Sequence, residues 1–81
     1  MDKTTRYFIG TLLDASKSDS NVMQFKKHGS VYFYRVGNSS RPWNLKKAKR
    51  VIPVHSLTIE LTKAKEEMRS RGLTVPGIVV E

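Results

Sequence analysis

The sequence predicts a small α+β domain, in which an antiparallel three-stranded sheet is packed by a C-terminal helix and a short basic helix lies between the two. Two observations support this fold class. The first half is rich in aromatic and branched residues separated by turn-forming runs, and residues 56–71 carry apolar side chains at helical spacing. The chain has 81 residues, enough for one small hydrophobic core, so we expect residues 1–81 to form a single domain.

The sheet is predicted from three segments of the first half: residues 6–13 ("RYFIGTLL"), 22–27 ("VMQFKK") and 30–36 ("SVYFYRV"). The second and third segments flank "HG" with the spacing of a tight hairpin. In the third segment, alternation places Phe33 and Arg35 on one face and Tyr32 and Tyr34 on the other. One of these faces should belong to the core.

The helix predicted over residues 56–71 has both of its ends marked. Ser56 can cap the start, and Gly72 suits the left-handed position after the last turn, where Leu73 would contact Met68. The apolar stripe of this helix consists of Leu57, Leu61, Ala64 and Met68, with Ile59 outside it. Beyond the helix, "IVV" at residues 78–80 can add a short strand at a sheet edge.

A basic segment, "RPWNLKKAKR" at residues 41–50, contains the only tryptophan of the chain. It does not alternate like a strand, whereas a helix over residues 42–51 separates an apolar side from a basic side. The apolar side would hold Leu45, Ala48 and Ile52, and the basic side Trp43, Lys46, Lys47 and Arg50. A tryptophan on the charged side of a helix can stack on a base while its neighbours neutralise phosphates, although a lone tryptophan can equally belong to a core.

The formal net charge is +8, and all of the excess lies in the middle of the chain. Residues 20–59 contain no Asp or Glu, but they hold Lys26, Lys27, Arg35, Arg41, Lys46, Lys47, Lys49 and Arg50. A field of one sign concentrated in one region attracts polyanions. The same charge would also keep a surface soluble without binding anything.

We therefore expect a non-catalytic nucleic-acid-binding domain whose contacts are dominated by phosphate, with DNA and RNA both open. Tyr32 and Tyr34 could add a stacking face, or simply form a half-exposed strand. The candidate binding residues are Lys26, Lys27, Tyr32, Tyr34, Arg35, Arg41, Trp43, Lys46, Lys47 and Arg50.

The composition argues against several other classes. There is no cysteine, so disulfides and thiolate metal sites are absent. The start, "MDKTTRYFIG", has an acid at position 2 and no apolar stretch, so we expect neither a signal peptide nor a membrane span. His28 and His55 have no carboxylate at metal-ligand spacing, and no phosphate loop or activated nucleophile is evident. We expect a cytoplasmic protein without metal, cofactor or enzymatic activity.

Residues 50–56 ("RVIPVHS"), followed by a helix that ends in "RGLT" (71–74), resemble the C-terminal part of HicA-type mRNA interferase toxins. The resemblance covers roughly a quarter of the chain and implies an α+β RNA-binding architecture. Those toxins carry a catalytic histidine in a "GSHH"-like strand start, where this chain has "GSVY" (29–32). Their N-terminal helix is replaced here by the strand predicted over residues 6–13. The missing histidine argues against their nuclease chemistry.

Two alternatives to nucleic-acid binding remain open. The protein could be a small inhibitor or adaptor that places its basic patch against an acidic protein surface and uses the "IVV" segment for strand addition. It could also be a ribonuclease-like toxin whose active site the sequence does not reveal. A homodimer through the C-terminal strand is compatible with each of these functions.

Overall fold

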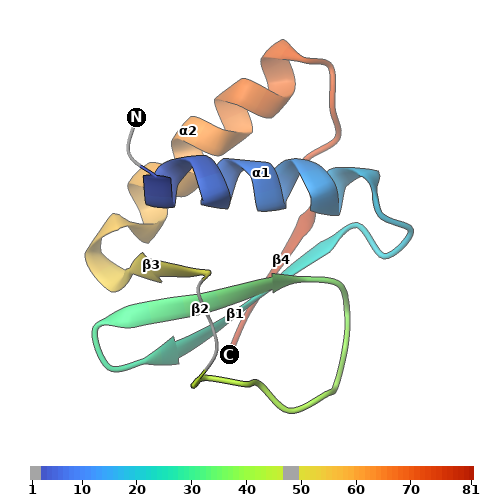
Figure 1. Ribbon diagram of the computed structural model, residues 1–81. Helices are drawn as coiled ribbons and strands as arrows, with labels where there is room; N and C mark the ends of the chain where they lie inside the picture. The colour runs from blue at the N-terminus through green and yellow to red at the C-terminus, as the bar shows by residue number, and fades with distance from the viewer. Residues whose placement is uncertain (1–2, 47–49) are drawn as a thin grey trace.

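The computed structural model describes residues 3–46 and 50–81. Within these residues the fold is α+β, as predicted, and both helices lie on one side of a mixed sheet (Figure 1). The elements in chain order are α1 (Lys3–Lys17), β1 (Val22–His28), β2 (Val31–Val36), β3 (Val51–Pro53), a 3₁₀ turn (Val54–Ser56), α2 (Leu57–Ser70) and β4 (Gly77–Val80).

The sheet has four strands in the described part of the chain, in the order β3-β2-β1-β4. Strands β1 and β2 form the predicted antiparallel hairpin, with His28 opposite Val31 and Gly29 in the turn at a φ of 63°. Strand β3 pairs antiparallel with β2, whereas β4 pairs parallel with β1. The expected strand at residues 78–80 is thus present at an edge, but the prediction of three antiparallel strands was wrong in number and direction.

The prediction of a strand over residues 6–13 was also wrong, because this segment lies inside α1. Phe8, Leu12 and Ala15 are fully buried and recur at spacings of four and three residues, which aligns them along one side of a helix. Their burial against the sheet outweighs the strand preference of the aromatic and branched residues in this segment. The N-terminal segment is therefore helical, and no strand replaces a helix there.

The C-terminal helix agrees with the prediction. Ala64 and Met68 are fully buried, Leu57 and Leu61 pack partly buried beside them, and Ile59 is exposed. The stripe of apolar residues at helical spacing thus faces the core.

Both ends of α2 lie within a residue or two of the predicted positions. The amide of Leu73 donates to the carbonyl of Met68 at 2.9 Å, and Gly72 has a φ of 69°. The amide of Gly72 donates to Arg69 at 3.0 Å, which completes a Schellman ending. Ser56 precedes the helix, but its side chain makes no capping hydrogen bond.

The predicted basic helix over residues 42–51 is wrong for the residues that the structure describes; residues 47–49 lie outside them. Ile52, which would have supplied part of its apolar side, is instead almost fully buried in β3, opposite Tyr32. Residues 42–46 are irregular, and just before them Arg35 donates hydrogen bonds to the carbonyl oxygens of Ser39 and Arg41. Sheet pairing and these bonds outweigh the local helical pattern.

The main core lies between the helices and one face of the sheet. Met23, Phe25, Tyr34 and Ile52 point into it from the strands, and the ring of Tyr34 lies 5.3 Å from that of Phe8. The face of β2 that carries the tyrosines is therefore the core face. On the opposite face of the sheet lies the described part of the segment that follows β2, residues 37–46, where Gln24 and Arg35 donate hydrogen bonds to the carbonyl of Ser39 (Figure 1).

Candidate nucleic-acid interface

The structure places the candidate binding residues on different sides of the sheet. Four of them, Lys26, Arg35, Arg41 and Trp43, line a shallow hollow of about 280 Å³ on the face away from the helices, and together with Glu81, which also lines it, they are named here the sheet-face cluster. Arg50 lies elsewhere, beside α1. The helical face on which Trp43 and Arg50 were expected to meet does not form.

Arg35 is the centre of the sheet-face cluster, and most of its donors are already used. Its Nε donates to Oε1 of the buried Gln24 at 2.7 Å. Its Nη2 donates to the carbonyl oxygens of Ser39 at 2.9 Å and Arg41 at 3.0 Å. The same guanidinium lies 4.0 Å from the centre of the Trp43 ring, in a cation–π contact. Arg35 therefore fastens the segment after β2 to the sheet.

Trp43 and Lys26 share a carboxylate partner. The indole Nε1 of Trp43 donates to Oε2 of Glu81 at 3.2 Å, and Nζ of Lys26 lies 3.9 Å from the same oxygen. The indole is partly buried over Arg35, so one of its faces is occupied. The cluster thus has an internal partner for its tryptophan and a carboxylate beside its lysine.

The other candidate residues are placed as follows. Tyr34 belongs to the core, and Tyr32 is partly buried against it with its ring edge-on to Phe25. Neither ring is available as a stacking surface in this arrangement. Lys27 and Lys46 are exposed, and Lys47 lies outside the described residues.

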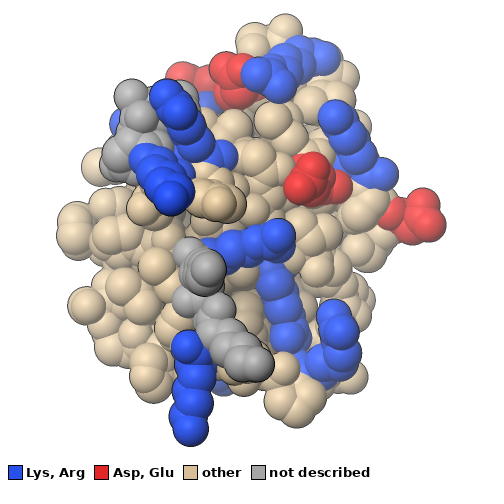
Figure 2. All heavy atoms as spheres, viewed as in Figure 1, with Lys and Arg blue, Asp and Glu red and all other residues tan. Residues whose placement is uncertain are grey.

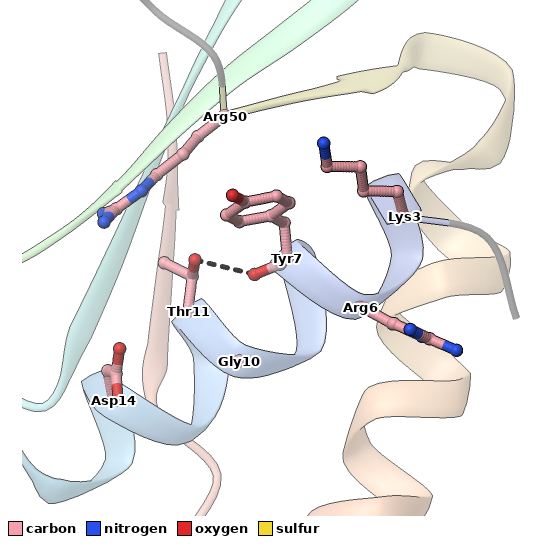
Figure 3. A pocket seen from close by; sticks show the side chains of 7 residues that line it. All are labelled: Lys3, Arg6, Tyr7, Gly10, Thr11, Asp14 and Arg50. Carbon is pink, nitrogen blue, oxygen red and sulfur yellow. Dashed lines mark hydrogen bonds between the residues drawn. The ribbon is translucent and has the colours of Figure 1, made fainter.

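A second site lies along α1, in a groove between this helix and the residues that enter β3. This helix-edge groove has a volume of about 360 Å³. Figure 3 shows the ring of Tyr7 between the side chains of Lys3 and Arg50, while Arg6 points away toward the outside. Tyr7 is 55% exposed, an unusual exposure for a large aromatic side chain. The lining residues are Lys3, Arg6, Tyr7, Gly10, Thr11, Asp14 and Arg50.

The helix-edge groove differs from the sheet-face cluster in the partners of its cations: Lys26 of the cluster lies beside the carboxylate of Glu81. Within residues 3–46 and 50–81, the ion pairs include neither Lys3 nor Arg50. Asp14 is the one acidic residue among those lining the groove, and it lies at the end opposite Lys3 (Figure 3). In Figure 2, the Asp and Glu side chains that are visible lie in the upper half of the view, whereas Lys and Arg also extend over the lower half. The groove therefore presents cations on both sides of an exposed ring.

Sequence reasoning missed Lys3, Arg6 and Tyr7 because it treated residues 6–13 as a strand. A helical signal was available: Lys3, Tyr7 and Asp14 recur at spacings of four and seven residues and so share one side of α1. Arg50 was among the candidates, but its neighbours in the groove come from a distant part of the sequence. Only the packing of α1 beside β3 brings them together.

A further hollow adjoins the groove and shares Lys3, Tyr7 and Arg50 with it. Its volume is about 420 Å³, and Thr4, Tyr34 and Val51 complete its lining. The hydroxyl of Tyr34 is buried and has no hydrogen-bond partner among residues 3–46 and 50–81. Burial raises the pKa of Tyr34 to about 12, against a smaller opposing effect of the Arg50 charge. The hydroxyl therefore keeps its proton at neutral pH and can donate it to a hydrogen bond.

The described residues were also compared with the requirements of a metal site, a histidine-based active site and a membrane-spanning helix. Among them, no group of three or more His, Cys, Asp or Glu side chains lies where it could hold a metal ion. His28 ends β1, with its ring 5.9 Å from Phe33, and His55 lies in the 3₁₀ turn before α2. Val31, rather than a histidine, begins β2. Neither described helix has the length and apolar character needed to span a bilayer.

Comparison of the chain with protein-family models, with curated proteins and with solved structures found no match. Function is therefore inferred from the geometry of this chain's own residues.

Proposed function

We propose that this protein binds nucleic acid without catalysing a reaction on it, with contacts dominated by phosphate and centred on the helix-edge groove. The observation that carries this proposal is the arrangement of Lys3 and Arg50 on either side of the exposed Tyr7 ring. Cationic side chains neutralise the phosphates of a strand, and an exposed aromatic ring stacks on a base. The groove supplies both kinds of contact in one place.

The charge of the whole molecule supports this choice of ligand. A net charge of +8 on 81 residues attracts polyanions over distances beyond direct contact. Lys3 and Arg50, which form no ion pair with another described residue, can exchange water and counterions for phosphate without first breaking an internal ion pair. Arg35, by contrast, would have to give up hydrogen bonds that hold the fold together.

A salt series tests the proposal. The affinity for single- and double-stranded DNA and RNA oligonucleotides is measured by fluorescence anisotropy from low to physiological salt. If phosphate contacts dominate, the logarithm of the affinity falls linearly with the logarithm of the salt concentration, with a slope of a few units. Absence of binding to every oligonucleotide at low salt would contradict the proposal.

Charge reversal locates the site within the molecule. Lys3→Glu and Arg50→Glu should each weaken binding and reduce the salt slope by about one unit, because each removes one phosphate contact. Arg41→Glu is the matched control, since Arg41 is also an exposed arginine but belongs to the sheet-face cluster. It changes the net charge equally and should reduce affinity less. Equal losses for Arg41 and Arg50 would show that only the overall charge matters.

A second candidate function is binding of an acidic protein, and the edge strand β4 favours it. Strand β4 pairs with β1 on one side, and the exposed side chains of Val79 and Val80 lie along it. An edge strand of this kind can accept a strand from a partner or from a second copy of the chain. If oligonucleotides fail to bind, size-exclusion chromatography with light scattering at several concentrations tests for the homodimer.

A further inference from the structure

The hollow beside the helix-edge groove contains a polar atom that lacks a partner. Tyr34 is 3% exposed, and its hydroxyl makes no hydrogen bond within the described residues. Buried hydroxyls nearly always have a partner, because an unsatisfied one costs free energy. Tyr34 lines this hollow, so a ligand bound there would supply the missing partner.

We propose that this hollow is a phosphate subsite, in which Lys3 and Arg50 hold one phosphate group of a nucleotide and the Tyr34 hydroxyl donates a hydrogen bond to it. The proposal deepens the proposed function, because it identifies the part of the surface that holds an individual phosphate. The three groups come from α1, β2 and the residue before β3, so only the folded chain assembles them.

The chemistry of the three groups is complementary to a phosphate. Lys3 and Arg50 supply positive charge, and neither forms an ion pair with another described residue. The Tyr34 hydroxyl keeps its proton, because burial raises its pKa to about 12. Hydrogen bonds from a neutral donor to an ionised oxygen are stronger than those between neutral groups. Phosphate offers oxygen acceptors to all three donors at once.

The size of the hollow indicates a ligand larger than a free phosphate. Its volume of about 420 Å³, with the adjoining groove of about 360 Å³, lies within the range of pockets that hold small organic ligands. Tyr7 lines both hollows and can stack on the base or ribose attached to the phosphate. A ligand reaches the buried Tyr34 hydroxyl only when neighbouring side chains move; Arg50, which lines the same hollow, is exposed, and rotamer changes of exposed side chains are fast.

The test uses adenosine 5′-monophosphate, adenosine and inorganic phosphate as probes of the ¹⁵N-labelled protein. Adenosine 5′-monophosphate should shift the amide resonances of Thr4, Tyr7 and Val51, and inorganic phosphate should shift the same resonances more weakly. Adenosine, which lacks the phosphate, should shift them least.

Tyr34→Phe then removes the hydroxyl and keeps the ring in the core. It should weaken adenosine 5′-monophosphate binding about tenfold, the loss expected for one hydrogen bond to a charged group. Its unfolding midpoint should be equal to or higher than that of the parent, because an unsatisfied donor is removed. Tyr32→Phe is the matched control: it lies on the same strand, does not line the hollow, and should bind like the parent.

The outcomes separate this inference from the proposed function. Parental affinity of Tyr34→Phe for adenosine 5′-monophosphate, or shifts confined to the sheet-face cluster, would overturn the subsite even if oligonucleotides bind with a steep salt dependence. Conversely, Tyr34-dependent binding of the mononucleotide without oligonucleotide binding would retain the subsite and refute the proposed function.

Discussion

The sheet-face cluster and the helix-edge groove combine the same kinds of residue, yet the structure uses them differently. Each has an aromatic side chain beside an arginine and a lysine. In the cluster, Arg35 donates to Gln24 and to two backbone carbonyls, and Trp43 donates to Glu81. In the groove, Tyr7 is exposed between cations that have no described ion pair. A basic and aromatic composition therefore does not itself distinguish a structural clamp from a binding surface.

The lesson is that hydrogen-bond partners decide between these two roles. A guanidinium that satisfies a buried amide and closes a segment onto a sheet contributes mainly to stability. An exposed cation without a partner contributes little to stability but remains available for an external anion.

Replacing Arg35 should have the largest effect on stability. Arg35→Met keeps most of the aliphatic stem but leaves Oε1 of the buried Gln24 without its donor. Loss of a hydrogen bond from a charged group costs about 1.5–3 kcal/mol of unfolding free energy. Urea denaturation measures this loss, and Arg50→Met is the matched variant, which should change stability by less than about 0.5 kcal/mol. Equal unfolding midpoints for Arg35→Met and Arg50→Met would contradict a structural role that Arg35 has and Arg50 lacks.

Removing an aromatic ring should affect binding in the groove but not in the cluster. Tyr7→Ala should lose about 1–3 kcal/mol of affinity for single strands, the range for one base stacked on an aromatic side chain. Trp43→Ala should leave this affinity nearly unchanged, since one face of the indole is already covered by Arg35. Fluorescence anisotropy measures both affinities.

The intrinsic fluorescence of Trp43 tests, without any substitution, whether a ligand binds at the sheet-face cluster or at the helix-edge groove. Trp43 is the only tryptophan, so its emission reports on the sheet-face cluster alone. The emission should respond little to added oligonucleotide. Strong quenching on binding would place the ligand on the cluster and contradict the assignment to the groove.

Gly72→Ala separates a loss of stability from a loss of binding. Gly72 has a φ of 69°, in the left-handed region where a β-carbon is unfavourable. The substitution should cost about 1 kcal/mol of unfolding free energy, measured by urea denaturation. Gly72 lines neither the groove nor the cluster, so affinity should stay at the parental level. A parallel loss of affinity would show that destabilisation alone can mimic a binding defect.

The smallest effect is expected from the acidic end of the groove. Asp14 is exposed and lines the groove opposite Lys3. Asp14→Asn removes a charge that repels phosphate, and exposed charge pairs contribute about 0.2–1 kcal/mol. The affinity for oligonucleotides should therefore increase slightly, most visibly at low salt. Asp19→Asn changes the net charge identically outside the groove and should have less effect.

Elements whose signals are local can be predicted from the sequence alone. The hairpin of β1 and β2 follows from two strand-forming runs around a tight turn, and α2 follows from its apolar stripe and Gly72. The helical spacing of Phe8, Leu12 and Ala15 in α1 was also readable, although residue type pointed to a strand. In these cases, the interactions that decide the conformation lie within a few residues of one another.

The division of the basic and aromatic residues between the sheet-face cluster and the helix-edge groove depends on tertiary contacts. The local pattern of residues 42–51 favours a helix, but Arg35 holds the backbone at Ser39 and Arg41 just before this segment, and Ile52 just after it pairs with Tyr32 in the sheet. The groove exists because α1 packs beside the residue before β3. This packing brings Lys3 and Arg50 to the same groove. Contacts between residues so distant in the chain leave no periodic signal in the sequence, since their free energy appears only when the core forms.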